Sequence, residues 1–149
     1  MISTRSRNVT DLSARLLLGG IFIWAAAWHL LHWKATVAML IKHPLLVRWI
    51  AGETVMTAAQ GLLVVAVAVM FIGGMSVTLG FRARLGSFLL IVFLVIVTPV
   101  CHHFWTLDKG AVEYQLAMLQ FLKNLGLIGG LLLIRNRTGR MWSIDRLWR

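Results

Sequence analysis

The sequence predicts an all-α integral membrane protein: a four-helix bundle that forms a single domain over residues 1–149. Three observations carry this prediction: 59% of the residues are hydrophobic, only 13% are charged, and the mean hydropathy is +0.81. Soluble domains hold roughly 45–50% apolar and about 25% charged residues, and a small domain leaves much of its surface exposed. The excess apolar surface of this chain must therefore face lipid rather than water.

The charge and the cysteine content exclude several classes of protein. The formal net charge is +10, but the basic residues stand between long apolar runs and do not line one face of a folded domain. The expected partner is therefore the lipid bilayer and not nucleic acid. The single cysteine excludes an internal disulfide and a Cys-rich metal or iron–sulfur site made by this chain alone.

Four apolar stretches are long enough to cross a hydrocarbon core about 30 Å thick, which needs about 20 residues of helix. The predicted spans cover about residues 12–33, 49–79, 85–101 and 114–134. Thr10 and Asp11 are candidate N-caps of the first span. Lys123 costs the fourth span roughly +3 kcal/mol of insertion free energy, so this helix depends on its neighbours and should turn its polar groups inward.

The basic residues of the loops predict the orientation. One side receives ten arginines: Arg5, Arg7, Arg15, Arg82, Arg84, Arg135, Arg137, Arg140, Arg146 and Arg149. The other side receives four basic residues: Lys34, Lys42, Arg48 and Lys109. Both termini are therefore expected in the cytoplasm, as in a multi-pass protein of a bacterial inner membrane. A competing interpretation treats the first apolar run as a signal peptide cleaved near Ala25–Ala27.

The polar residues gather in the non-cytoplasmic half of the predicted bundle. All five histidines fall there: His29, His32, His43, His102 and His103. Glu53 lies about one turn into the second span, and Lys123 is its candidate partner on the fourth span, with Gln60 nearby. An ionisable group inside a membrane marks a candidate functional site, although the pair can also serve only to hold helix register. Histidines at a membrane edge are more often interfacial residues than ligands, so these histidines can also be interpreted in that way.

Gly126 and Gly130 form a G-x-x-x-G step in the fourth span. Such a step lets another helix approach closely, either within the bundle or in a homo-oligomer.

Several motifs, in order, resemble the DoxX family of small four-helix membrane proteins over about residues 13–147. At the span edges these are RLLLG at 15–19, GE at 52–53 and GFRARL at 80–85. The more specific ones are HFW at 103–105, QFLKNL at 120–125, GGLLL at 129–133, and GR followed by SID at 139–145. One position departs from the family pattern, because His29 stands where many relatives have a lysine.

The resemblance implies a membrane subunit of a redox complex that contacts quinone near the outer leaflet and anchors a partner oxidoreductase. The recurring polar positions of the family fall on Glu53, His103, Trp105, Lys123 and Asn124, which would form the quinone-binding or polar site. The sequence holds no flavin or nicotinamide fingerprint, so the chain would be an accessory subunit that is not active alone.

Two alternatives stay open. Histidines on facing helices, His29, His32, His102 and His103, are candidate ligands of a haem or a metal ion, because bundle interiors commonly hold such cofactors. The other alternative is a non-catalytic assembly or structural protein of the membrane. A transporter would need several subunits, since four helices enclose only a narrow path.

Overall fold

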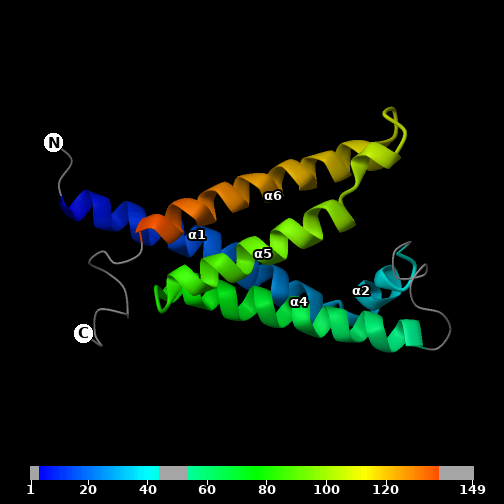
Figure 1. Ribbon diagram of the computed structural model, residues 1–149, viewed down its shortest axis with the longest axis horizontal. Coiled ribbons are helices and arrows are strands. Elements are labelled where there is room, and N and C mark those ends of the chain that lie inside the picture. Colours follow the sequence, from blue (N-terminus) through cyan, green and yellow to red (C-terminus); the bar gives the residue numbers. More distant parts are fainter. Residues whose placement is uncertain (1–3, 44–53, 138–149) are drawn as a thin grey trace.

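The computed structural model describes residues 4–43 and 54–137, all of them in helices or short connections. The elements in chain order are α1 (Thr4–Leu31), α2 (Trp33–Leu40), α4 (Thr54–Leu79), α5 (Ala83–Cys101), the 3-10 helix η1 (Phe104–Thr106) and α6 (Val112–Arg137). The four long helices run up and down along one axis (Figure 1). The all-α class expected from the sequence is confirmed for this part of the chain.

Four helices are long and apolar enough to cross a membrane. Their candidate spans are Asn8–Leu31, Thr54–Leu79, Ala83–Thr106 and Val112–Asn136. They match the predicted spans, except that residues 49–53 of the second lie outside the described residues. The expected start of the first span is wrong, because α1 already includes Thr10 and Asp11, which therefore do not cap it. The orientation in the membrane stays a prediction.

Helix α2 is an additional short helix that the sequence does not predict, because the stretch after the first span reads as a loop. The chain breaks at His32, whose φ and ψ of −108° and 33° are not helical, and turns helical again at Trp33. No proline or glycine interrupts residues 33–40, and Val37 is buried where α2 packs on α4. Burial of this apolar side chain gives a helix of only eight residues a tertiary anchor, which it needs because short helices are marginal alone.

The packing follows the chain in pairs. Helix α1 packs mainly against α4, α4 against α5 and α5 against α6, whereas α1 and α6 touch only sparingly. Figure 1 shows why: at the end of the bundle where α2 lies, α6 and the end of α5 lean away from α1, α2 and α4. The bundle is therefore closed at one end and opens toward the other.

Small residues set the distance between α1 and α4. A Cβ on Gly19 would collide with the Thr78 hydroxyl and would lie 2.7 Å from the carbonyl oxygen of Gly74. Only a residue without a side chain permits this approach of two backbones, which is the usual way that helices associate in lipid. Leu90 of α5 similarly fills the space over Gly73 of α4.

The turn between α4 and α5 is tight and positions two arginines. Gly80 and Arg82 both have positive φ, 72° and 47°, so the chain reverses within three residues. The Ser76 hydroxyl donates a 2.6 Å hydrogen bond to the carbonyl of Phe81. This bond holds the turn against α4 and so places Arg82 and Arg84 at the closed end of the bundle.

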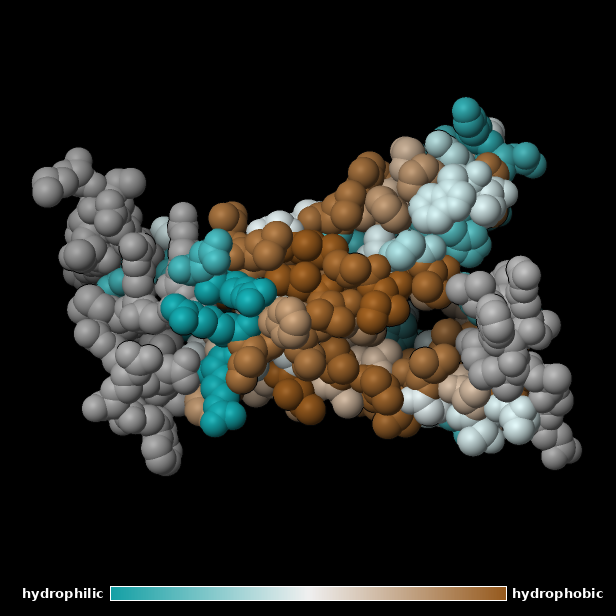
Figure 2. Space-filling model, viewed as in Figure 1, coloured by the Kyte–Doolittle hydropathy of each residue, from teal (hydrophilic) through white to brown (hydrophobic). Residues whose placement is uncertain are grey.

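The outer surface is apolar, as the composition predicts. The side chains of Leu17, Trp24, Leu31 and Met39 are all more than 70% exposed. Figure 2 shows the hydrophobic surface as a band between two hydrophilic ends. A contiguous apolar surface of this size is far larger than a water-soluble monomer exposes, so the band is the surface that faces lipid.

Candidate functional site

One face of α6 changes from buried to exposed along the helix. Residues 18 or 11 positions apart share nearly the same direction on an α-helix, so Leu116, Lys123, Leu127 and Ile134 lie on one face. Toward the closed end this face is buried, with Ile134 at 4% and Leu127 at 9% exposure. At Lys123 it becomes exposed, and Leu116 is 58% exposed. Of the polar groups predicted to face inward on α6, Lys123 is thus uncovered where α6 leans away from the bundle.

Asn124 marks the last firm contact of α6 with α5. Its side-chain amide donates a 3.1 Å hydrogen bond to the Thr98 hydroxyl, and both residues are buried. Lys123, the preceding residue, is turned by about 100° from this contact, toward the side of α1. Gln120 lies one turn further along α6 and is also exposed.

The opening therefore has a polar lining in an apolar wall. Figure 2 shows the hydrophobic surface hollowed on the side of α2, with hydrophilic atoms visible inside the hollow. The expected pair of Lys123 with Glu53 stays a prediction, because Glu53 lies outside the described residues. Among the described carboxylates, none forms an ion pair with Lys123.

The histidines of the first hairpin make local contacts. The ring of His29 lies 3.4 Å from the Thr36 hydroxyl, which ties the end of α1 to α2. The ring of His32 stacks on Trp28 at 3.9 Å, and its Nδ1 lies 3.0 Å from the Trp28 carbonyl oxygen. Both rings therefore make their contacts within α1, α2 and the residue that joins them.

A second pair of histidines caps the end of α5. His43 Nε2 and His103 Nδ1 lie 3.1 and 2.9 Å from the same acceptor, the carbonyl oxygen of Val100. The last carbonyls of a helix have no intrahelical donor, which explains why two side chains converge there. The two rings meet edge to face at 5.9 Å. His43 thus connects the segment after α2 to α5, far away in the sequence.

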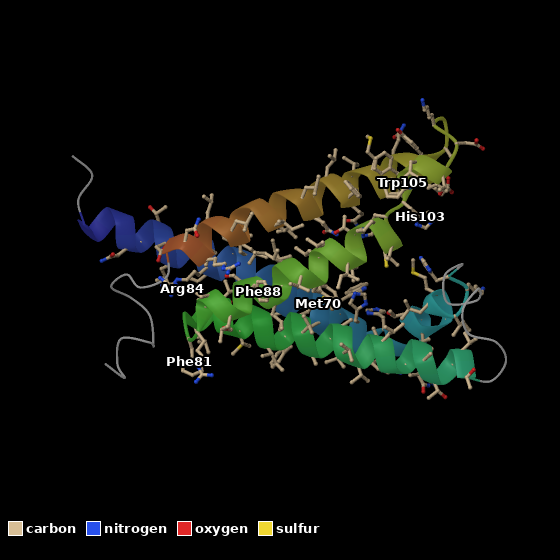
Figure 3. All side chains as sticks on the ribbon, viewed as in Figure 1. Met70, Phe81, Arg84, Phe88, His103 and Trp105 are labelled. Atoms are coloured by element: carbon tan, nitrogen blue, oxygen red, sulfur yellow. The ribbon has the colours of Figure 1, made fainter. Side chains whose placement is uncertain are left out.

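An aromatic cluster covers the loop between α5 and α6. Phe104 contacts Trp105, Tyr114 and Phe121 edge to face, with ring centroids 5.4, 5.7 and 5.4 Å apart. Trp105 is 56% exposed and also meets Phe121. Figure 3 shows Trp105 and His103 at the same end of the molecule, opposite Phe81 and Arg84. Exposed aromatic rings at a span edge are typical of the membrane interface.

The residues proposed as haem or metal ligands do not form one cluster. In the described part of the chain no three His, Cys, Asp or Glu side chains come close enough to hold a metal ion. His29 and His32 contact Thr36 and Trp28, whereas His103 contacts Val100 and His43.

The two glycines of the predicted G-x-x-x-G step have different surroundings. A Cβ on Gly130 would lie 2.9 Å from the Leu18 side chain, so this glycine serves the contact of α6 with α1. Gly126 has nothing within 4 Å of its Cβ position. The step therefore does not act as one packing surface inside the bundle.

The sequence did not predict three features of the structure: Thr98 as the partner of Asn124, the contact of His43 with α5, and the burial of Arg15. Thr98 and Asn124 stand on different spans, so no spacing in the sequence connects them. A polar residue beside Pro99 in an otherwise apolar span was the available sign that Thr98 has a partner. Arg15 was interpreted as a topology charge at the edge of the first span, yet the residue is only 3% exposed and its Nε lies 3.9 Å from a carboxylate oxygen of Asp11.

Comparison with known proteins corrects the family expected from the motifs. Residues 49–135, more than half of the chain, match the family model described as HR-like lesion-inducing. No curated protein and no solved structure matches the chain.

This match overturns the resemblance to the DoxX family, which rested on short motifs. The role inferred from that resemblance, a quinone-contacting subunit of a redox complex, is wrong for the same reason. A bacterial inner membrane is likewise unsupported, because the matching family is one of plant membrane proteins. The chain belongs to the HR-like lesion-inducing family.

Proposed function

We propose that this member of the HR-like lesion-inducing family binds an amphipathic molecule with an anionic head group within the bilayer. The molecule lies in the opening between α6 and the α1–α4 pair, and its head contacts the Lys123 ammonium. Family membership supplies the class of protein and not the ligand. The observation that carries the proposal is the position of Lys123 on the bundle-facing side of α6, where that side is uncovered.

The cost of a charge in hydrocarbon supports an anionic ligand. A lysine near the centre of a membrane helix is unfavourable by about 2.5–3.5 kcal/mol unless a partner or water compensates it. Lys123 lies in the span Val112–Asn136, and the described carboxylates leave it without an ion pair. A ligand carboxylate or phosphate would offset this cost, and Gln120 would add a neutral hydrogen-bond donor one turn away.

The surroundings of Lys123 suit the apolar part of such a molecule. Leu116, Leu119 and Leu122 are each more than half exposed on the same half of α6. The side chains of Thr98 and Asn124 are hydrogen-bonded to each other at the polar end of the site. Lys123 is then the charged group that the site offers to a ligand. The arrangement combines one cation with apolar walls, which is the usual composition of a small-molecule site.

The test compares two probes that differ only in charge. Palmitic acid carrying a photoreactive diazirine, and the methyl ester of the same probe, are crosslinked to the full chain in phosphatidylcholine nanodiscs. We expect the acid to label the half of α6 around Leu116 and the ester to label it about ten-fold less, because a charged hydrogen bond contributes about 1.5–3 kcal/mol. Lys123→Met should reduce labelling by the acid to the level of the ester, whereas Lys109→Met, in the loop, should not.

The predicted partner of Lys123 provides the opposing outcome. If Glu53 neutralises Lys123, the wild-type chain will not prefer the acid, and Glu53→Gln will create that preference. Equal labelling by acid and ester in the wild type, or full labelling of Lys123→Met by the acid, would also refute the proposal.

Two finer expectations belong to the same picture. The charge asymmetry of the loops supports cytoplasmic termini, with the Lys123 opening in the opposite half of the membrane. For homo-oligomerisation through the Gly126–Gly130 step, only Gly126 offers a free surface, because nothing lies within 4 Å of its Cβ position whereas Gly130 packs on Leu18. Crosslinking of the Gly126→Leu variant in nanodiscs, with Gly61→Leu on α4 as a control at another open glycine, checks it.

A further inference from the structure

The outward face of α1 carries a row of three large side chains. Leu17, Trp24 and Leu31 follow one another at intervals of seven residues and are 72%, 72% and 80% exposed. Residues seven apart on an α-helix differ by only about 20° in direction, so the three lie in one line along the helix. Gly19 and Phe22, on the opposite face, are buried in the bundle. The row is therefore turned away from the rest of the bundle.

Small residues alternate with the large ones in this row. Each lies four positions before a large residue: Ser13, Gly20 and Ala27. Ser13 and Ala27 are exposed, and a Cβ added at Gly20 would meet nothing within 4 Å. Alternating steps of three and four residues are the a and d positions of a heptad, through which two helices pack side by side. Because side chains tilt toward the N-terminus of their helix, each large side chain leans over the small residue that precedes it.

Trp24 is unusual for a position that faces lipid. It lies seven residues, about 10 Å of helix, inside the end of the candidate span Asn8–Leu31. Tryptophan is enriched at the two membrane interfaces, where its indole N–H finds an acceptor, whereas the hydrocarbon core holds no water to accept that bond. A second helix on this face would cover the ring and would present backbone oxygens that a residue such as Gly20 leaves uncovered.

The row suits a second copy of this chain. From Ser13 to Leu31 its positions hold no charged residue, so two copies do not bring like charges together. Copies inserted in the same orientation place their α1 helices parallel, related by a two-fold axis along the membrane normal. The large side chains of one copy then fill the space over the small residues of the other, and the two spacings match because the helices are identical.

We propose that α1 packs against α1 of a second copy to form a parallel homodimer in the bilayer. The contact, called the α1 seam, consists of the three large and three small residues of the row: Ser13, Leu17, Gly20, Trp24, Ala27 and Leu31. The seam includes neither Lys123 nor Gly126. The inference is therefore independent of the function proposed for the opening and of association through α6.

Energy transfer between donor- and acceptor-labelled copies in phosphatidylcholine liposomes measures association as the lipid-to-protein ratio rises. Dyes are attached at Lys109→Cys in a Cys101→Ser background. The test variant is Gly20→Leu and the control is Gly61→Leu on α4, because neither Cβ position has a neighbour within 4 Å. Both should fold as the wild type does, but only the first overfills the seam. An overpacked contact costs about 1–3 kcal/mol, so association of Gly20→Leu should weaken at least about five-fold.

Disulfide crosslinking locates the contact without a bulky substitution. In the Cys101→Ser background, Gly20→Cys should form a covalent dimer on oxidation and Gly61→Cys should not, because only the seam brings equivalent positions of two copies together. If Gly20→Leu fails to fold, this pair of variants decides by itself.

Three results would overturn the inference. The first is a chain that stays monomeric at every lipid-to-protein ratio. The second is unchanged association of Gly20→Leu, or equal crosslinking of Gly20→Cys and Gly61→Cys. The third is association that is lost in Gly126→Leu and kept in Gly20→Leu, which would assign the contact to α6.

Discussion

The Asn124 amide and the Thr98 hydroxyl form a buried hydrogen bond of 3.1 Å between α6 and α5. This bond stands at the point where α6 begins to lean away from the bundle. On one side of it the inward face of α6 is packed, and on the other side Lys123 is exposed. The bond therefore positions the helix that carries the charge of the proposed site.

A double-mutant cycle measures this contact. Asn124→Ala, Thr98→Val and the combination should show a coupling free energy of about 0.6 kcal/mol and at most about 1.7 kcal/mol, the range for hydrogen bonds between membrane helices. The measurement is the free energy of unfolding of the full chain in mild detergent. Gln120→Ala combined with Thr98→Val should be additive, since Gln120 is exposed and the Thr98 hydroxyl is bound by Asn124. Additivity of the Asn124 pair as well would show that the bond contributes nothing.

Gly19 and Gly126 should respond differently to the same substitution. Gly19→Ala should destabilise the protein by about 1–3 kcal/mol, because the backbone of Gly74 blocks the new methyl group and cannot move aside cheaply. Gly126→Ala meets nothing within 4 Å, so its effect should stay within about 0.5 kcal/mol. Thermal unfolding of both variants in the same detergent checks this, and equal effects would contradict the close approach of α1 and α4.

His43 should hold α2 in place through the Val100 carbonyl. His43→Ala removes a hydrogen bond of about 1 kcal/mol, so amide hydrogens of α2 should exchange up to about five-fold faster. The end of α5 should be unaffected, because His103 still occupies the same carbonyl.

Hydrogen exchange measured by mass spectrometry separates the two histidines. His103→Ala is the matched control and should leave α2 unchanged while His43 is present. If α2 exchanges at the wild-type rate in His43→Ala, its position depends on burial of Val37 and on the contact of His29 with Thr36, and not on His43.

Labelling of single cysteines tests the orientation. In a Cys101→Ser background, a membrane-impermeant maleimide added outside the cell should label Lys42→Cys and Lys109→Cys but not Arg84→Cys. The arginine-rich end would then be cytoplasmic, as the loop charges predict. The reverse pattern would invert the protein and place the Lys123 opening in the cytoplasmic half.

The sequence by itself determined the class of protein and its spans. Apolar stretches of about 20 residues have one stable state in lipid, a helix that satisfies its own backbone hydrogen bonds. Composition and local pattern are therefore sufficient to find α1, α4, α5 and α6. The inward direction of Asn124 also followed from the sequence, because a polar side chain in hydrocarbon turns toward a partner.

Only the tertiary structure decided which polar groups meet. Thr98 became the partner of Asn124, His43 reached Val100, and Gly130 packed on Leu18 while Gly126 stayed open. The sequence could not distinguish these outcomes, because contacts between helices depend on rotation, tilt and register, and small changes in these cost little when every helix is apolar all around. The short motifs also suggested the wrong family, which the match over residues 49–135 corrected.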